Sequence, residues 1–331
     1  MDALARLVWN PTEMRPRAGW RIALHLTAYL FTPPLAVWLL GDPLGSRLAP
    51  LFAAPPALGE RIALILLRLF TVVAVTWLFA AYLDRRRWVD LGWQLDRHWW
   101  EDLGFGLLLG AVLMGIVFFI ELAAGWVEIT GYFVVGLADT TFAVAILGPI
   151  TVFIVVGIIE ELLCRGYQLR NLAEGYPGAA IQPRQAVLWG WAGSSALFGL
   201  LHIFNPHVTP LSIFYLMLTG GLFGLGYVLT GRLGLPIGLH ITWNLVQANV
   251  FGFPVSGNIF DSATVIAIRQ HGPEVWTGGA FGPEAGIVGL IALALGAWAT
   301  VAWVRLRYGR VALDLSQAVY HPRPHSAPIN L

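Results

Sequence analysis

The chain has 331 residues, of which 57% are hydrophobic and 12% are charged, and its formal net charge is +1. In soluble domains about a quarter of all residues are charged, so this composition excludes an ordinary soluble protein. The near-neutral net charge gives no sign of a nucleic-acid partner. We therefore expect an all-α fold, a polytopic helical bundle whose surroundings are the lipid bilayer.

Hydropathy predicts about eight transmembrane helices, each close to the ~20 residues that span a bilayer. The crossings are expected near residues 20–40, 62–83, 103–124, 142–164, 186–204, 210–229, 235–252 and 284–304. All 20 basic residues are arginines, and an inside N-terminus places most of them in inner segments, as the positive-inside rule requires. We expect the protein to lie in the cytoplasmic (inner) membrane of a bacterium, with its N- and C-termini on the inner side.

The whole chain, 1–331, is predicted to form a single integral membrane domain. Residues 253–283 are rich in Gly and Pro and predict a long outer loop. The last residues, 311–331, are expected to form a C-terminal tail. No feature of the sequence predicts an oligomeric state.

Two adjacent glutamates, Glu160 and Glu161, end the apolar stretch of the fourth crossing, and Arg165 follows. An ionisable residue inside a membrane has a high free-energy cost, so its presence indicates a functional site unless another role is found. On a helix Glu161 can pair with Arg165, while Glu160 is rotated by about 100° and left available as a general base. The alternative is that both glutamates face a solvated vestibule. A helix that begins at Phe142 would place Glu160 about 27 Å along its axis, near the inner end.

The fifth crossing contains Phe198 and His202, which share a helical face at a spacing of four. A single histidine on an apolar helix is more often a core residue than a catalyst. Simple alternation of the crossings would place His202 toward the outer side. We therefore expect this crossing to begin only near Trp189 and Trp191, to tilt, or to break before Pro206.

The seventh crossing contains His240 and Asn244, again four residues apart and shortly after Pro236. Proline favours the first turn of a helix, and an imidazole and a carboxamide near that positive end could stabilise an anion. The alternative is a pair of hydrogen bonds between helices.

Together these residues could hydrolyse a peptide bond. Glu160, with His202 as a possible partner, would activate a water molecule. The tetrahedral oxyanion would be bound by His240 and Asn244. The supporting residues Glu161, Arg165 and Phe198 would fix this geometry.

In these three motifs the sequence resembles the CAAX prenyl protease and bacteriocin-processing family of intramembrane proteases, called CPBP or Abi. The family's signatures match Glu160, Glu161 and Arg165, then Phe198 with His202, then His240 with Asn244, in the same order. The resemblance covers residues 142–252, which we take as the catalytic core. It implies an endopeptidase that acts on a membrane-associated protein or peptide, of the CAAX type or the bacteriocin-processing type. In the eukaryotic branch, such enzymes remove the last three residues of prenylated CAAX proteins.

The resemblance leaves the catalytic type open, since the family is described both as metalloendopeptidase and as glutamic-type. Zinc would have Glu160, His202 and His240 as possible ligands. The chain lacks the helical His-Glu-x-x-His pattern of a strong zinc site, so we expect a glutamate mechanism with no cofactor. Two other functions remain open, a proton-coupled transporter and a catalytically silent membrane scaffold.

Overall fold

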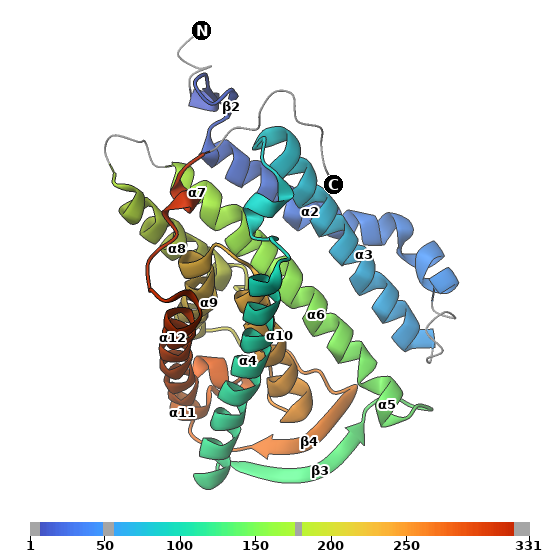
Figure 1. The fold of residues 1–331 in the computed structure, drawn as a ribbon. Coiled ribbons are helices and arrows are strands. Elements are labelled where there is room, and N and C mark those ends of the chain that lie inside the picture. The colour runs from blue at the N-terminus through green and yellow to red at the C-terminus, as the bar shows by residue number, and fades with distance from the viewer. Residues whose placement is uncertain (1–6, 49–55, 176–180, 321–331) are drawn as a thin grey trace.

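The fold is a bundle of membrane-length helices with two small sheets (Figure 1). It is seen in a computed structural model that describes residues 7–48, 56–175 and 181–320. The long helices are α2 (Ala18–Leu48), α3 (Pro56–Leu78), α4 (Arg97–Ala123), α6 (Leu147–Glu161), α8 (Pro183–Leu200), α9 (Pro210–Thr230), α10 (Gly234–Leu245) and α12 (Ile287–Tyr308). Each predicted crossing contains one of them, so the predicted helical bundle is confirmed.

Shorter elements join or extend the long helices. The α-helical ones are α5 (Phe142–Ala145), α7 (Arg170–Gly175) and α11 (Glu274–Thr277). The π-helical ones are η2 (Phe79–Leu83), η4 (Leu162–Leu169) and η5 (Val246–Val250). The 3-10 helices are η3 (Trp88–Leu91), η6 (Gly279–Phe281), η7 (Pro283–Ala285) and η8 (Leu315–Ala318).

Six helical stretches in the described part of the chain are long and apolar enough to cross a membrane. The two predicted crossings outside this group are those of α8 and α10. Helix α10 has only 12 residues, fewer than the ~20 that span the hydrocarbon core. Helix α8 has 18 residues and contains three glycines and two serines. These two helices carry the second and third motifs.

The fourth crossing is longer than the predicted range 142–164. One continuous helical run of 34 residues, Phe142–Gly175, combines α5, α6, η4 and α7. Glu160 therefore lies near the middle of this run and not near its inner end. The prediction was wrong because the helix continues as π-helix through a buried, partly polar segment where hydropathy suggested an end.

Two small sheets depart from the purely helical prediction. Strands β1 (Trp9–Asn10) and β2 (Arg15–Pro16) pair near the N-terminus. Strand β3 (Val127–Val135) pairs antiparallel with β4 (Ala263–Gln270), which lies inside the segment predicted as an outer loop. The two strands of this second pair are more than a hundred residues apart, so local sequence gives no sign of their pairing.

The structure describes the predicted C-terminal tail through residue 320, and its remainder, 321–331, lies outside the described residues. The backbone N–H of Asp314 donates to the Val228 carbonyl, and the Gln317 amide donates to the Tyr227 carbonyl. The Arg15 guanidinium stacks on the Tyr320 ring, with its carbon 3.3 Å from the ring centroid. This part of the tail therefore packs on the end of α9 and on the N-terminal segment.

Helix α10 is held in place by close packing against α4. Gly106 in α4 faces Gly238 in α10, while Gly110 packs against residues 239–243 of α10 and Gly234 packs against residues 99–103 of α4. Within each helix the two glycines have the four-residue spacing of a small-residue helix contact. A Cβ atom at Gly106 or at Gly238 would lie 2.3 Å from a backbone carbonyl oxygen of the facing helix. The two backbones thus approach as closely as glycine allows, which fixes the depth of the third motif.

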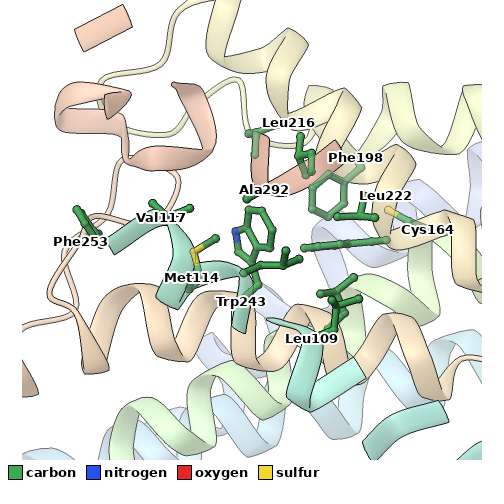
Figure 2. Close-up of a cluster of buried hydrophobic side chains, with 14 of the residues drawn as sticks. Leu109, Met114, Val117, Cys164, Phe198, Leu216, Leu222, Trp243, Phe253 and Ala292 are labelled. Atoms are coloured by element: carbon green, nitrogen blue, oxygen red, sulfur yellow. The ribbon is translucent and has the colours of Figure 1, made fainter. Parts of the chain in front are cut away.

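The core beside this crossing is built around Trp243, which is 1% exposed. Figure 2 shows the indole among buried side chains that include Leu109, Met114, Leu216 and Ala292. These residues come from α4, α9 and α12, so α10 is packed on several sides. The residue after Trp243 is Asn244, and this packing positions its carboxamide.

We expect Gly106→Ala to destabilise the protein, because the added methyl group would push α4 and α10 apart. Overpacking of this kind costs about 1–3 kcal/mol. Thermal unfolding of the purified protein in detergent measures the effect as a lower midpoint. Gly104→Ala in the same helix is the control, since no atom lies within 4 Å of a Cβ there. Equal midpoints for the two variants would contradict the proposed contact.

Candidate active site

Glu161 is the buried centre of the first motif. Its carboxylate is fully buried and accepts a hydrogen bond of 2.9 Å from Arg165 Nη1, so the spacing correctly predicted this ion pair. The same oxygen, Oε1, lies 2.8 Å from His240 Nδ1. Arg165 also donates through Nη2 to the Gly220 carbonyl at 2.6 Å. One carboxylate thus connects α6, η4, α9 and α10.

Glu160 has a different environment from its neighbour. Its side chain is 19% exposed, whereas that of Glu161 is 0% exposed. The Glu160 Oε2 atom lies 3.9 Å from His240 Nε2, too far for a direct hydrogen bond. One of the adjacent carboxylates is therefore sealed in the protein, and the other is open to a cavity.

His240 lies between the two glutamates, and its hydrogen-bond partner fixes its orientation. Because a carboxylate only accepts hydrogen bonds, Nδ1 carries the hydrogen that is donated to Glu161. The other nitrogen, Nε2, faces Glu160. The aromatic rings of Phe198 and Phe223 pack against the imidazole, with centroid distances of 5.8 and 4.7 Å.

His202 does not lie on α8, because this helix ends at Leu200. It lies in the turn that precedes α9, and this irregularity was anticipated for the fifth crossing. Its Nδ1 atom is 2.8 Å from the Phe198 carbonyl oxygen, which can only accept, so Nδ1 carries a hydrogen. Its Nε2 atom is therefore free to accept a hydrogen bond when the imidazole is neutral.

Phe198 connects the motifs through its ring. The Arg165 guanidinium carbon lies 4.8 Å from the ring centroid, in cation–π contact. On another side the ring packs against His202, 5.1 Å away between centroids. The residue thus separates the buried ion pair from the open part of the site.

A cavity of about 340 Å³ joins the three motifs. Its wall includes Glu160, His202, His240 and Asn244, so all four residues predicted to be catalytic meet at one place. The supporting residue Phe198 also lines it. Such a concave site with a few convergent polar groups is the usual form of a binding or catalytic site.

Sequence reasoning missed several polar residues of this cavity. They are Tyr29, Arg68, Asn205, Ser256, Asn258 and Glu284. Most of them lie in segments distant in sequence from the three motifs, whereas Asn205 follows His202 by three residues, beyond the end of α8. No spacing rule within one helix could have found them.

Glu284 is the most buried of these missed residues, at 3% exposure. It accepts hydrogen bonds from the hydroxyl and the backbone N–H of Ser256 and from the Gln247 amide. Burial raises the pKa of its carboxyl above the ordinary value, and these hydrogen bonds oppose the increase. Ser256 has a φ of 47°, an uncommon conformation for a residue with a side chain, and its bonds to Glu284 stabilise it.

The Glu284 bonds extend to the turn that contains His202. The Ser256 carbonyl accepts a hydrogen bond from the Asn205 amide at 2.9 Å. The Asn205 backbone N–H in turn donates to the His202 carbonyl at 3.0 Å. A connected set of bonds therefore links η7, the segment around Ser256 and the second motif.

A zinc site would need three donors at bonding distance. Among the described residues, no three His, Cys, Asp or Glu side chains form such a group. The proposed ligands Glu160, His202 and His240 line one cavity but do not converge on a common point. This donor arrangement does not fit zinc.

The fold and the cavity define an integral membrane protein in which a carboxylate, two imidazoles and a carboxamide meet between the helices. Residues 141–246 match the family model described as type II CAAX prenyl endopeptidase Rce1-like, which confirms the family resemblance of the three motifs. Searches of curated proteins and of solved structures found no match. At the family level, the match implies a CAAX protease-like endopeptidase embedded in the membrane.

We expect Arg165→Gln to unfold at a clearly lower temperature, because it leaves the Glu161 carboxylate buried without its guanidinium. Breaking a buried pair by removing one partner costs about 3–5 kcal/mol. The double variant Glu161→Gln/Arg165→Gln should lose less, since no buried charge remains. The control is Arg97→Gln, which breaks an exposed pair with Glu101 at the same spacing, worth about 0.5 kcal/mol. If the single and the double variant unfold at the same temperature, the unpaired Glu161 charge does not cause the destabilisation.

We expect Glu284→Ala to speed backbone amide exchange in residues 253–258 by about tenfold, because Ser256 loses the acceptor of its N–H. Losing such a buried bond costs about 1–3 kcal/mol. Hydrogen–deuterium exchange followed by mass spectrometry measures the rates. Glu274→Ala, at an exposed glutamate of the same region, is the control and should leave them unchanged. Unaltered exchange in both variants would show that Glu284 does not hold this segment.

Proposed function

We propose that the chain is an intramembrane endopeptidase that hydrolyses a peptide bond of a membrane-associated substrate, with a water molecule activated by Glu160. The observation that carries the proposal is the meeting of Glu160, His202, His240 and Asn244 at one cavity. The family match to a CAAX prenyl endopeptidase supports a substrate of the CAAX type. A bacteriocin-processing substrate is the related alternative.

In the proposed first step, Glu160 removes a proton from water, and the hydroxide attacks the carbonyl carbon of the scissile bond. His202 Nε2 accepts the second hydrogen of this water and orients it, since its Nδ1 hydrogen is engaged by the Phe198 carbonyl. The partial exposure of Glu160 supports its role as base, because water can reach it.

The oxyanion that forms is bound by His240 and Asn244. His240 donates through Nδ1–H to Glu161 and through Nε2–H to the oxyanion. The Asn244 amide provides the second donor, and the packing of Trp243 fixes its place.

In the last step, the tetrahedral intermediate collapses and the carbon–nitrogen bond breaks. The leaving amine takes the proton that Glu160 removed from water, so the base returns to its carboxylate form. The products are a new carboxylate on one fragment and an amine on the other. No step passes through a metal.

We expect Glu160→Gln to reduce cleavage by at least a hundredfold, because the amide keeps the shape of the side chain but cannot accept the proton. Cleavage of a prenylated peptide in reconstituted membranes, followed by mass spectrometry, measures the loss. Glu121→Gln is the control, since Glu121 is also a buried glutamate of a membrane helix but bonds to Gln270 away from the cavity.

Undiminished cleavage by the Glu160 variant would contradict the assignment of the base. The metal content of the purified protein and its activity after chelation test the catalytic type in the same preparations. A protein that contains stoichiometric zinc and loses activity on chelation would contradict the metal-free mechanism.

A further inference from the structure

Arg68 is a charged residue of the cavity that the proposed mechanism does not use. It lies on α3 within the membrane span Leu58–Leu83, ten residues from one end and fifteen from the other. At 1.5 Å per residue, the nearer end is about 15 Å away along the helix axis. An arginine side chain reaches about 6 Å, so the guanidinium cannot reach a lipid phosphate by extending along the helix.

Two arginines within α2 and the fourth crossing have carboxylate partners. Arg165 pairs with Glu161, and Arg21 lies 3.2 Å from Asp84. Arg68 forms no ion pair with a carboxylate of the described residues, and its polar partner is the Tyr29 hydroxyl, to which it donates a hydrogen bond. Arg68 is an exposed residue of the bundle that also lines the cavity. A cation at this depth of the membrane is costly, and an anionic group that enters the cavity beside it lowers this cost.

The position of Arg68 relative to the proposed base indicates what this anion is. Helix α3 packs against α6, which carries Glu160, and Tyr29 interacts electrostatically with both Arg68 and Glu160. Arg68 and the proposed base therefore line the same cavity from neighbouring helices. A CAAX-type substrate has its free C-terminal carboxylate three residues beyond the scissile bond, about 10 Å in an extended chain.

We propose that Arg68, held by Tyr29, binds the C-terminal carboxylate of the substrate and so selects the peptide bond three residues from the chain end. The proposal rests on the endopeptidase function proposed above. A guanidinium matches a carboxylate with two parallel hydrogen bonds, which suits Arg for recognising a chain end. Such an ion pair favours substrates with a free terminus over capped ones.

The test compares two prenylated peptides that differ only at the C-terminus, one with a free carboxylate and one with a carboxamide. For the wild-type protein in proteoliposomes we expect kcat/KM to be 10- to 100-fold higher for the acid. For Arg68→Gln the ratio should fall to about one, mainly because kcat/KM for the free-carboxylate peptide falls. Arg68→Lys should keep part of the preference. Arg61→Gln, at an exposed position of the same helix outside the cavity, should keep all of it.

Two outcomes overturn the proposal. The first is a wild-type protein that cleaves both peptides equally well. The second is an Arg68→Gln variant that loses activity equally on both, because Arg68 would then act on the charge of Glu160 and not on the substrate.

Binding separates this proposal from the endopeptidase function. In the Glu160→Gln background, fluorescence titration should show tighter binding of the acid than of the amide, and adding Arg68→Gln should remove the difference. If the wild type cleaves neither peptide but still binds the acid more tightly than the amide, the carboxylate site is supported and the endopeptidase function is refuted. If the protein cleaves both peptides and neither binding nor rate differs between the acid and the amide, the carboxylate site is refuted and the endopeptidase function is retained.

Discussion

The site depends on one buried carboxylate. Glu161 accepts bonds from Arg165 and His240, and Arg165 continues the connection to the Gly220 carbonyl of α9. A carboxylate and a guanidinium with no exposure are stable only while each keeps its partners, since an uncompensated charge in such an interior is strongly unfavourable. The helices of the bundle therefore cannot separate here without a large loss of free energy. This requirement, more than the apolar packing, determines that the three motifs meet.

The same requirement explains why the glutamates are adjacent. Neighbouring residues of a helix point about 100° apart, so one can face a protein interior while the other faces a cavity. Glu161 stabilises the structure and Glu160 remains open, with exposed fractions of 0% and 19%. His240 bonds to Glu161 through Nδ1 and faces Glu160 through Nε2. The imidazole is therefore the group through which the Glu161–Arg165 pair can influence Glu160. A single rigid helix thus gives the base an accurate position without burying it.

Local sequence was sufficient wherever the relevant contact lies within one helix. The Glu161–Arg165 pair and the eight helical segments follow from hydropathy and the four-residue spacing. Contacts between distant segments could not be found this way. The pairing of β3 with β4 and the bonds of Glu284 to Ser256 join segments whose approach only the folded chain determines. The length of the fourth crossing was misjudged for a related reason, because tertiary packing keeps the polar residues after Glu161 helical where hydropathy alone suggests an end.

Short and interrupted helices bring the histidines to the base. Helix α8 ends two residues before His202, and α10 has only 12 residues before it continues as π-helix. Interrupted helices leave backbone and side-chain polar groups that need partners within the membrane. Asn205, Gln247 and Glu284 supply such partners around the segment that contains Ser256. These polar bonds are therefore a structural consequence of placing a wet cavity inside a helical bundle. They explain why a third carboxylate, that of Glu284, lies beside a site whose motifs contain only two.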